Sequence, residues 1–75
     1  MKELIEFIAK SLADSPNDVV VTEEAEEDGI KLTLKVADED KGRIIGKQGR
    51  IAQAMRTLIR VKAAKAGTRA RLEIL

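Results

Sequence analysis

The chain has 75 residues with a net charge of +1, and it contains neither cysteine nor histidine. This length allows one small domain, and without those two residue types a disulfide framework and a zinc finger are excluded. No apolar run approaches the roughly 20 residues that cross a bilayer, and the first residues lack the pattern of a signal peptide, so we expect a cytoplasmic protein with no membrane partner.

The N-terminal segment, residues 2–13, predicts an amphipathic α-helix. Its large apolar residues recur at the spacing of one helical face: Leu4, Ile5, Ile8 and Leu12. The only aromatic residue of the chain, Phe7, lies beside this stripe. Pro16 ends the helical region, because proline has no N–H to donate and disfavours helical angles in the residue before it. We therefore expect this helix to cover the core.

Two alternating segments, residues 19–26 and 30–36, predict a β-hairpin. The first opens with β-branched residues, and the second has an apolar residue at every other position from Ile30 to Val36. The turn signal between them ends at Gly29. The first strand carries four glutamates: Glu23, Glu24, Glu26 and Glu27. We expect them to face solvent and to protect an edge of the sheet from pairing with another chain.

The second half of the chain predicts two helices and a last strand. A short helix is expected over residues 41–45, with the acidic residues before it as a cap that suits the helix dipole. A longer helix is expected over residues 50–66, ended by Gly67. Its apolar face is predicted from five residues: Ile51, Met55, Leu58, Ile59 and Ala66. Residues 69–75 alternate with a period of two and predict a strand.

The predicted elements follow the order α-β-β-α-α-β. Because the hairpin strands are antiparallel, a third strand aligned with them must be parallel to one of the two. We therefore expect an α+β fold, with a three-stranded mixed sheet and helices packed on one face. No internal repeat, low-complexity stretch or linker interrupts the pattern, so residues 1–75 are expected to form a single domain.

Four residues between the two later helices form the main candidate site: Gly46, Lys47, Gln48 and Gly49. Glycine has no Cβ, so another backbone can approach closely and φ can be positive without strain. A helix that begins just after Gly49 points its unpaired N–H groups and the positive end of its dipole at the loop. Lys47, Arg50 and Arg43 add positive charge. A phosphate group is therefore the natural ligand.

The small net charge hides a strong asymmetry. Residues 1–40 contain 12 acidic and 4 basic side chains, a balance of −8, whereas residues 41–75 contain 1 acidic and 10 basic side chains, a balance of +9. The basic half suggests a polyanionic partner, although a solvated charged surface is the plainer explanation. Arg56 and Arg60, spaced i, i+4, either extend a phosphate track or are solvated. Four further basic residues are interpreted as surface charges or partners of the acidic half: Lys62, Lys65, Arg69 and Arg71.

The segment from Ile44 to Ile51 resembles the signature of the KH domain. An apolar pair, Ile44 and Ile45, precedes a GxxG loop and an isoleucine at the second position of the next helix. A helix and strand placed before the shared core, rather than after it, are typical of the bacterial, type II form, and the resemblance covers nearly the whole chain. The chain is similar to the small bacterial single-KH proteins of the KhpA type.

This resemblance implies binding of single-stranded RNA, in the role of an RNA chaperone or post-transcriptional regulator, and association with a second copy or with a Jag-type KH protein. With Arg43 and Arg50 added for their charge, the expected RNA-binding residues form one continuous segment: Arg43, Ile44, Ile45, Gly46, Lys47, Gln48, Gly49, Arg50 and Ile51. Lys47 and Gln48 would be the variable pair facing the phosphates of about four nucleotides. The isoleucines would support the loop and line the groove for the bases. With one aromatic residue, base stacking on a sheet, as in an RRM, is not expected.

Other classes of protein fit the loop less well. A purely structural turn can also contain GxxG, so the loop alone is weak evidence. A nucleotide-binding P-loop is excluded because three residues separate Gly42 from Gly46 where four are needed, and Gln48 stands where a magnesium-binding hydroxyl is required. An enzyme is not expected, since no nucleophile, base and orienting group are brought together by spacing. The sequence implies no cofactor, metal or small-molecule substrate.

The long helix also predicts a protein interface. Val61 lies about 100° from the centre of the predicted apolar face, next to Ala54 and beside Leu58. We hypothesise that this flank meets a second KH chain and forms a homodimer or heterodimer. The alternative is that Val61 fills an edge of the core. A dimerising scaffold whose loop is only structural is therefore the second hypothesis for the function.

Overall fold

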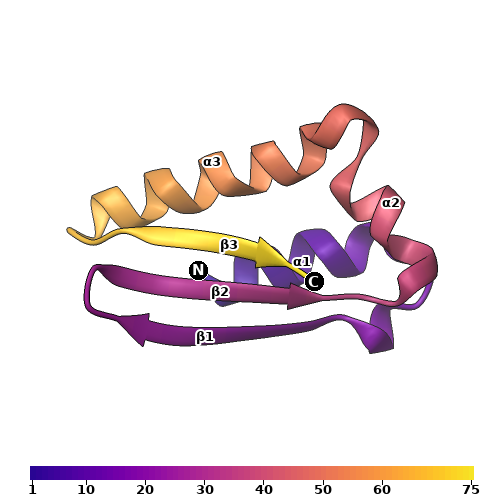
Figure 1. Cartoon of the computed structure of the whole chain (residues 1–75), viewed down its shortest axis with the longest axis horizontal. Coiled ribbons are helices and arrows are strands. Elements are labelled where there is room, and N and C mark those ends of the chain that lie inside the picture. Colours follow the sequence, from indigo (N-terminus) through magenta and orange to yellow (C-terminus); the bar gives the residue numbers. More distant parts are fainter.

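The computed structural model of the protein describes residues 1–75. Its helices and strands follow the predicted order (Figure 1): α1 (Lys2–Leu12), β1 (Val20–Glu26), β2 (Gly29–Lys35), α2 (Lys41–Ile45), α3 (Arg50–Lys65) and β3 (Ala70–Ile74). Three single turns of 3-10 helix connect them: Pro16–Asp18, Asp38–Asp40 and Lys47–Gly49. All the predicted helices and strands are present, and the predicted order α-β-β-α-α-β is confirmed.

The three strands form one mixed sheet in the order β1-β2-β3. β1 is antiparallel to β2, with Val21 opposite Leu34. β3 is parallel to β2, with Leu72 opposite Leu32. β1 and β3 are therefore the two edges of the sheet. The glutamates predicted for the first strand are exposed on the β1 edge, as expected from their charge.

The core lies between one face of the sheet and the helices. Alternating strand residues point to that face, and the buried ones are Val21, Leu32, Leu34 and Leu72, joined by Val36 just after β2. The helices contribute Ile5 and Ala9 from α1, Ile44 from α2, and Met55 and Ile59 from α3. In Figure 1, α1 passes behind the strands and α3 runs along β3. This α+β arrangement, with helices covering one face of a mixed sheet, confirms the predicted fold class.

The buried face of α3 differs from the predicted one. Its buried residues are Ala52, Met55, Ile59 and Ala63. Met55 and Ile59 were predicted, but Leu58 is 46% exposed and Ala66 is exposed as well. Small alanine side chains let the helix approach the sheet closely, so the contact face turns toward the alanines rather than toward the largest side chains. This rotation leaves Leu58 on the surface.

Asp40 corrects the prediction of an acidic cap on the short helix. It is the residue before α2, but no side chain caps that helix. Asp40 is instead 1% exposed, and its two carboxylate oxygens accept hydrogen bonds from the N–H groups of Asp14 and Ser15, each at 3.1 Å. These N–H groups lie just after α1, where the helix no longer supplies partners. The buried carboxylate thus ties the end of α1 to the start of α2.

Candidate nucleic-acid interface

The loop between α2 and α3 owes its shape to three residues with positive φ. Gly46 has φ 81° and ψ 171°, Gln48 has φ 57°, and Gly49 has φ 72°. The N–H of Gly49 donates a hydrogen bond of 3.1 Å to the carbonyl oxygen of Gly46, which closes the turn. A Cβ at Gly46 would lie 2.7 Å from Cγ1 of Ile51, so both the backbone angle and the space require glycine there.

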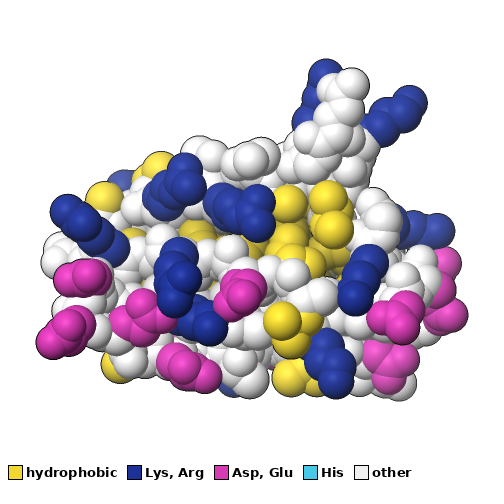
Figure 2. Space-filling view, viewed as in Figure 1, with side chains coloured by type: hydrophobic (Ala, Val, Ile, Leu, Met, Phe, Trp, Pro, Cys, Tyr) yellow, Lys and Arg dark blue, Asp and Glu magenta, His cyan; other side chains and the backbone are white.

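Charged and polar side chains stand on the outside of this turn. Lys47, Gln48 and Arg50 are exposed, and the Arg50 guanidinium donates a hydrogen bond of 3.1 Å to Oε1 of Gln48. No side chain caps the start of α3, so its first N–H groups have no side-chain partner. Figure 2 shows this part of the molecule standing out from the body, with Lys and Arg side chains at its tip. The turn therefore presents positive charge and N–H donors to an anion.

The predicted isoleucines have separate positions. Ile44 is fully buried in the core, so it supports the loop without reaching the surface. Ile45 is 38% exposed at the end of α2, and Ile51 is half-buried with its side chain beside Gly46. Figure 2 shows hydrophobic side chains gathered between α2, α3 and the end of β3. Ile45 is the most exposed of the three and is therefore the isoleucine best placed to contact a base.

Arg43 is not brought together with the other basic residues of the loop. Its guanidinium Nη1 lies 2.7 Å from Oδ1 of Asp14, forming an ion pair. Two residues correspond to about 200° of helix, so Arg43 leaves α2 on the side away from Ile45. Lys41, four residues before Ile45, shares its face instead and lies 3.5 Å from Asp38. Sequence reasoning did not select Lys41, although the i, i+4 spacing to Ile45 was available.

The structure gives Arg56 and Arg60 a defined neighbour. Both lie on the flank of α3 next to β3, which we call the basic flank. Nε of Arg56 donates a hydrogen bond of 3.4 Å to the backbone carbonyl of Leu72 on β3. A cavity of about 90 Å³ opens beside them, lined by both arginines and by residues of β3. These two side chains therefore border the seam between α3 and the outer edge of β3.

The opposite flank of α3 is apolar and exposed. We call Ala54, Leu58 and Val61 the apolar flank. Val61 is 52% exposed and Leu58 46% exposed, and Ala54 is exposed too. None of the three belongs to the hydrophobic core. The alternative in which Val61 fills an edge of the core is therefore wrong.

The comparisons with known proteins agree with this geometry. The family model described as the KH domain of KhpA and KhpB matches residues 2–74. The chain belongs to the KhpA/KhpB family of KH domains. It is 53% identical over 75 residues to the RNA-binding protein KhpA of Clostridium perfringens and 55% identical to that of Clostridium acetobutylicum, covering 100% of each chain. It is 49% identical to the KhpA of Listeria monocytogenes, covering 100% of this chain and 99% of that one.

Membership of the KhpA/KhpB family settles several predictions. The resemblance to a type II KH domain is confirmed, and so is the bacterial character of the related proteins. The family consists of RNA-binding proteins and not of enzymes, which confirms the prediction that no reaction is catalysed. In the structure, no helix combines the length and the apolar character that crossing a membrane requires.

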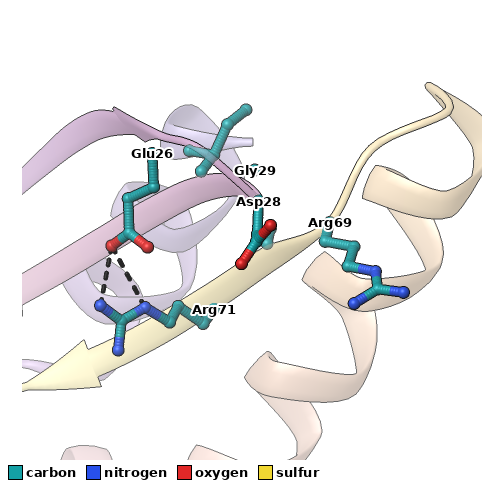
Figure 3. Close-up of a pocket in the computed structure, with 7 residues that line it drawn as sticks. Glu26, Asp28, Gly29, Arg69 and Arg71 are labelled. Atoms are coloured by element: carbon teal, nitrogen blue, oxygen red, sulfur yellow. Dashed lines mark hydrogen bonds and ion pairs between the residues drawn. The ribbon is translucent and has the colours of Figure 1, made fainter.

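The end of the hairpin, away from this loop, forms a separate cavity of about 400 Å³ (Figure 3). Arg71 donates hydrogen bonds from Nε and Nη2 to Oε1 of Glu26, at 3.2 and 2.7 Å. This bond, with the charge of Glu26, raises the pKa of Arg71. Lys31 likewise lies 3.0 Å from Glu73 and lowers the pKa of that carboxyl by hydrogen bonding and charge. Both cations are already engaged by carboxylates, and for Arg71 the partner lies in the acidic half, which was one of the two interpretations of this residue.

Proposed function

We propose that the chain binds single-stranded RNA through the loop of Gly46, Lys47, Gln48 and Gly49, as an RNA chaperone or post-transcriptional regulator in the cytoplasm. One observation carries the proposal: the loop turns on residues with positive φ and leaves Lys47 and Gln48 exposed directly before the uncapped start of α3. The relatives named as RNA-binding proteins match over their full length. A KH loop clamps about four backbone nucleotides.

The chemistry of the surroundings suits a sugar-phosphate backbone. Lys47 and Arg50 supply positive charge, and the helix dipole adds to it. Bases would lie against the exposed side chain of Ile45. The only aromatic residue, Phe7, is 71% exposed but lies on α1, not on α2 or α3. Because stacking on aromatic rings is absent from the loop region, we expect weak binding that tolerates many sequences.

The first experiment measures binding of a fluorescent pool of single-stranded RNA to the wild type and to a Lys47→Asp, Gln48→Asp double variant. We expect the wild type to bind and the variant to lose most of its affinity, since two negative charges replace the phosphate contacts. Wild-type affinity should also fall steeply between low and moderate salt, by about 0.7 in log K per log salt for each phosphate contact.

A double variant at another exposed pair serves as the control. Lys35→Asp together with Asn17→Asp makes the same charge change at exposed positions outside both the loop and α3. Both variants are checked for folding by circular dichroism. If the loop variant binds as well as the wild type, or if the wild type does not bind, the loop is a structural turn and the proposal fails.

We further propose that the apolar flank pairs the chain with a second KH chain. Leu58 and Val61 are large aliphatic side chains whose exposure nothing else in the fold explains. One KH unit contacts about four nucleotides, so pairing two units would increase both affinity and specificity. The second chain is another copy, giving a homodimer, or a Jag-type KH protein, giving a heterodimer. A dimerising scaffold without RNA binding remains the second candidate.

Sedimentation of Val61→Asp tests the pairing. We expect the wild type to sediment as a dimer and the variant as a monomer, because a carboxylate in an apolar interface is strongly disfavoured. Gln53→Asp, also exposed on α3 but outside the apolar flank, is the matched control and should remain dimeric. Equal masses for the wild type and Val61→Asp would contradict the homodimer.

A further inference from the structure

The carboxylates without partners lie in one short segment of the chain. Of the 13 acidic side chains, only five make neither an ion pair nor a hydrogen bond: Asp18, Glu23, Glu24, Glu27 and Asp28. All five are exposed, and residues 18–28 contain no lysine or arginine. In Figure 2, Asp and Glu side chains gather in the lower part of the view, where β1 lies, and none stands on the projecting loop. The acidic charge that the chain does not neutralise itself is therefore concentrated on β1 and its two ends.

β1 is an open edge whose main protection is this charge. It pairs only with β2, so the N–H and C=O groups along its other side have no strand partner. The register with β2 runs without interruption from Val20 to Glu26, and the strand contains neither a bulge nor a proline. Every residue of this strand except Val21 is exposed. A regular, uncovered edge of seven residues is a template on which another extended chain can pair.

The charge of the edge decides which chain can use it. A second copy that paired β1 with β1 would bring glutamates of both strands together, and like charges opposite each other destabilise a strand pair. A nucleic acid is a polyanion and would be repelled as well. A strand rich in lysine or arginine would instead place opposite charges beside Glu23 and Glu24, on both faces of the sheet, because successive side chains alternate. The carboxylates therefore exclude most extended chains and favour a basic one.

A cavity at the start of β1 adds a place for one side chain. It has a volume of about 410 Å³ and is lined by residues just before and within the start of β1 and by the end of β2 with the residues after it. Val20 is 50% exposed and forms an apolar wall with Ala37, and Asp18 contributes a carboxylate without a partner. Lys35 and Asp38 also line the cavity, and Asp38 is already in an ion pair. The stem of an incoming lysine or arginine can pack on the apolar wall while its charged head reaches Asp18.

We propose that β1 binds an extended, lysine- or arginine-rich segment of another protein, which joins the sheet as a fourth strand and places one basic side chain in the cavity beside Val20. Hydrogen bonds to the free side of β1 supply affinity, and the pairs with Glu23, Glu24 and Asp18 supply selectivity. β1 and β3 are opposite edges of the sheet, and α3 runs along β3 (Figure 1). The segment therefore docks on the side of the sheet away from α3, and the site does not depend on the proposed function.

Two labelled peptides of equal charge separate strand addition from general attraction. The first is fluorescein-labelled Val-Lys-Lys-Val-Lys-Lys-Val, and the second has proline in place of its last two valines. We expect the wild type to bind the first peptide, more weakly as salt increases, and to bind the second about fivefold less tightly, because each proline removes an N–H donor. Hydrogen exchange of β1 amides should slow when the first peptide binds. Equal affinity for the two peptides would show that no strand is added and would overturn the proposal.

Matched variants of the protein locate the site on β1. Glu23→Gln with Glu24→Gln should weaken binding of the first peptide about threefold to tenfold, as expected for two exposed charge pairs. Glu3→Gln with Glu6→Gln removes the same two charges from α1 and should leave the affinity close to that of the wild type. Asp18→Asn should weaken binding about twofold if the cavity holds a lysine. Equal losses for the two double variants, or a wild type that binds neither peptide, would overturn the proposal.

Discussion

The two flanks of α3 share one helix and one buried face but differ in their surroundings. The basic flank of Arg56 and Arg60 lies beside β3, where a backbone carbonyl holds the Arg56 guanidinium at 3.4 Å. The apolar flank of Ala54, Leu58 and Val61 has no strand beside it and remains open. Arginine side chains pack against α3 and β3 where the edge strand offers carbonyl acceptors. The aliphatic side chains remain exposed where no element of the same chain covers them.

This difference suggests that one helix separates two kinds of contact. The apolar flank is proposed to face a second KH chain, whereas the basic flank carries the phosphate track that the sequence left open for Arg56 and Arg60. Because the two flanks are about 150° apart around the axis, a single exposed substitution alters one of them at a time. Substitutions can therefore show whether RNA binding and pairing are independent.

The substitution expected to have the largest effect is Gly46→Ala. A non-glycine residue at φ 81°, ψ 171° costs about 1–3 kcal/mol, and the contact of the new Cβ with Ile51 at 2.7 Å adds to that cost. We expect a fall in the free energy of unfolding and at least tenfold weaker RNA binding, about 1.4 kcal/mol. Pairing through the apolar flank should persist in the fraction that is folded. Thermal unfolding, RNA titration and sedimentation measure the three quantities.

Gly42→Ala is the control for that change. Gly42 lies inside α2, and a Cβ there would meet no atom within 4 Å. Alanine is favoured over glycine within a helix by about 0.5–1 kcal/mol, so this variant should be more stable than the wild type. If Gly46→Ala is as well tolerated as Gly42→Ala, the loop does not require its observed backbone conformation, and the proposed RNA-binding loop loses its structural basis.

The fold could be predicted from the sequence because its local signals agree with one another. Alternation over residues 30–36 defined the central strand, and Pro16, Gly29 and Gly67 marked ends of elements. The order of elements predicted only that the third strand is parallel to one strand of the hairpin, and the structure shows that this strand is β2. The face of α3 could not be predicted as well, because Ala52 and Ala63 carry little hydrophobic weight and yet are buried. These alanines let α3 approach the sheet closely, and this effect depends on the sheet residues that face them.

The candidate site could be predicted only in part, for a similar reason. Two glycines separated by two residues indicate a tight turn with positive φ, so Gly46 and Gly49 could be predicted as loop residues from their spacing. Arg43 pairs with the side chain of Asp14, and Asp40 accepts hydrogen bonds from the backbone N–H groups of Asp14 and Ser15. In each case the partner is more than 20 residues away in sequence. No local pattern predicts such pairings.

Asp40→Asn should have an intermediate effect, and it separates stability from binding. The substitution keeps one acceptor oxygen but places an NH₂ group against a backbone N–H of Asp14 or Ser15. Leaving one buried donor unpaired costs about 1–3 kcal/mol. Asp40 lies on neither flank of α3, so RNA affinity and sedimentation of the folded protein should not change. Chemical denaturation measures the loss, and a stability equal to that of the wild type would show that the N–H groups are satisfied in another way.

The smallest effect is expected for Arg56→Leu, which removes a charge from the basic flank and keeps an aliphatic stem. Losing the hydrogen bond to the Leu72 carbonyl costs about 0.5–1.5 kcal/mol of stability. RNA affinity should fall about threefold, and the salt slope by about 0.7, if the seam carries one phosphate beside this residue. Lys62→Leu removes a charge from an exposed position that lines no cavity, and should alter neither quantity. If the two variants have equal effects, the basic flank acts only through its net charge. The two flanks would then differ in their amino-acid composition but not in their function.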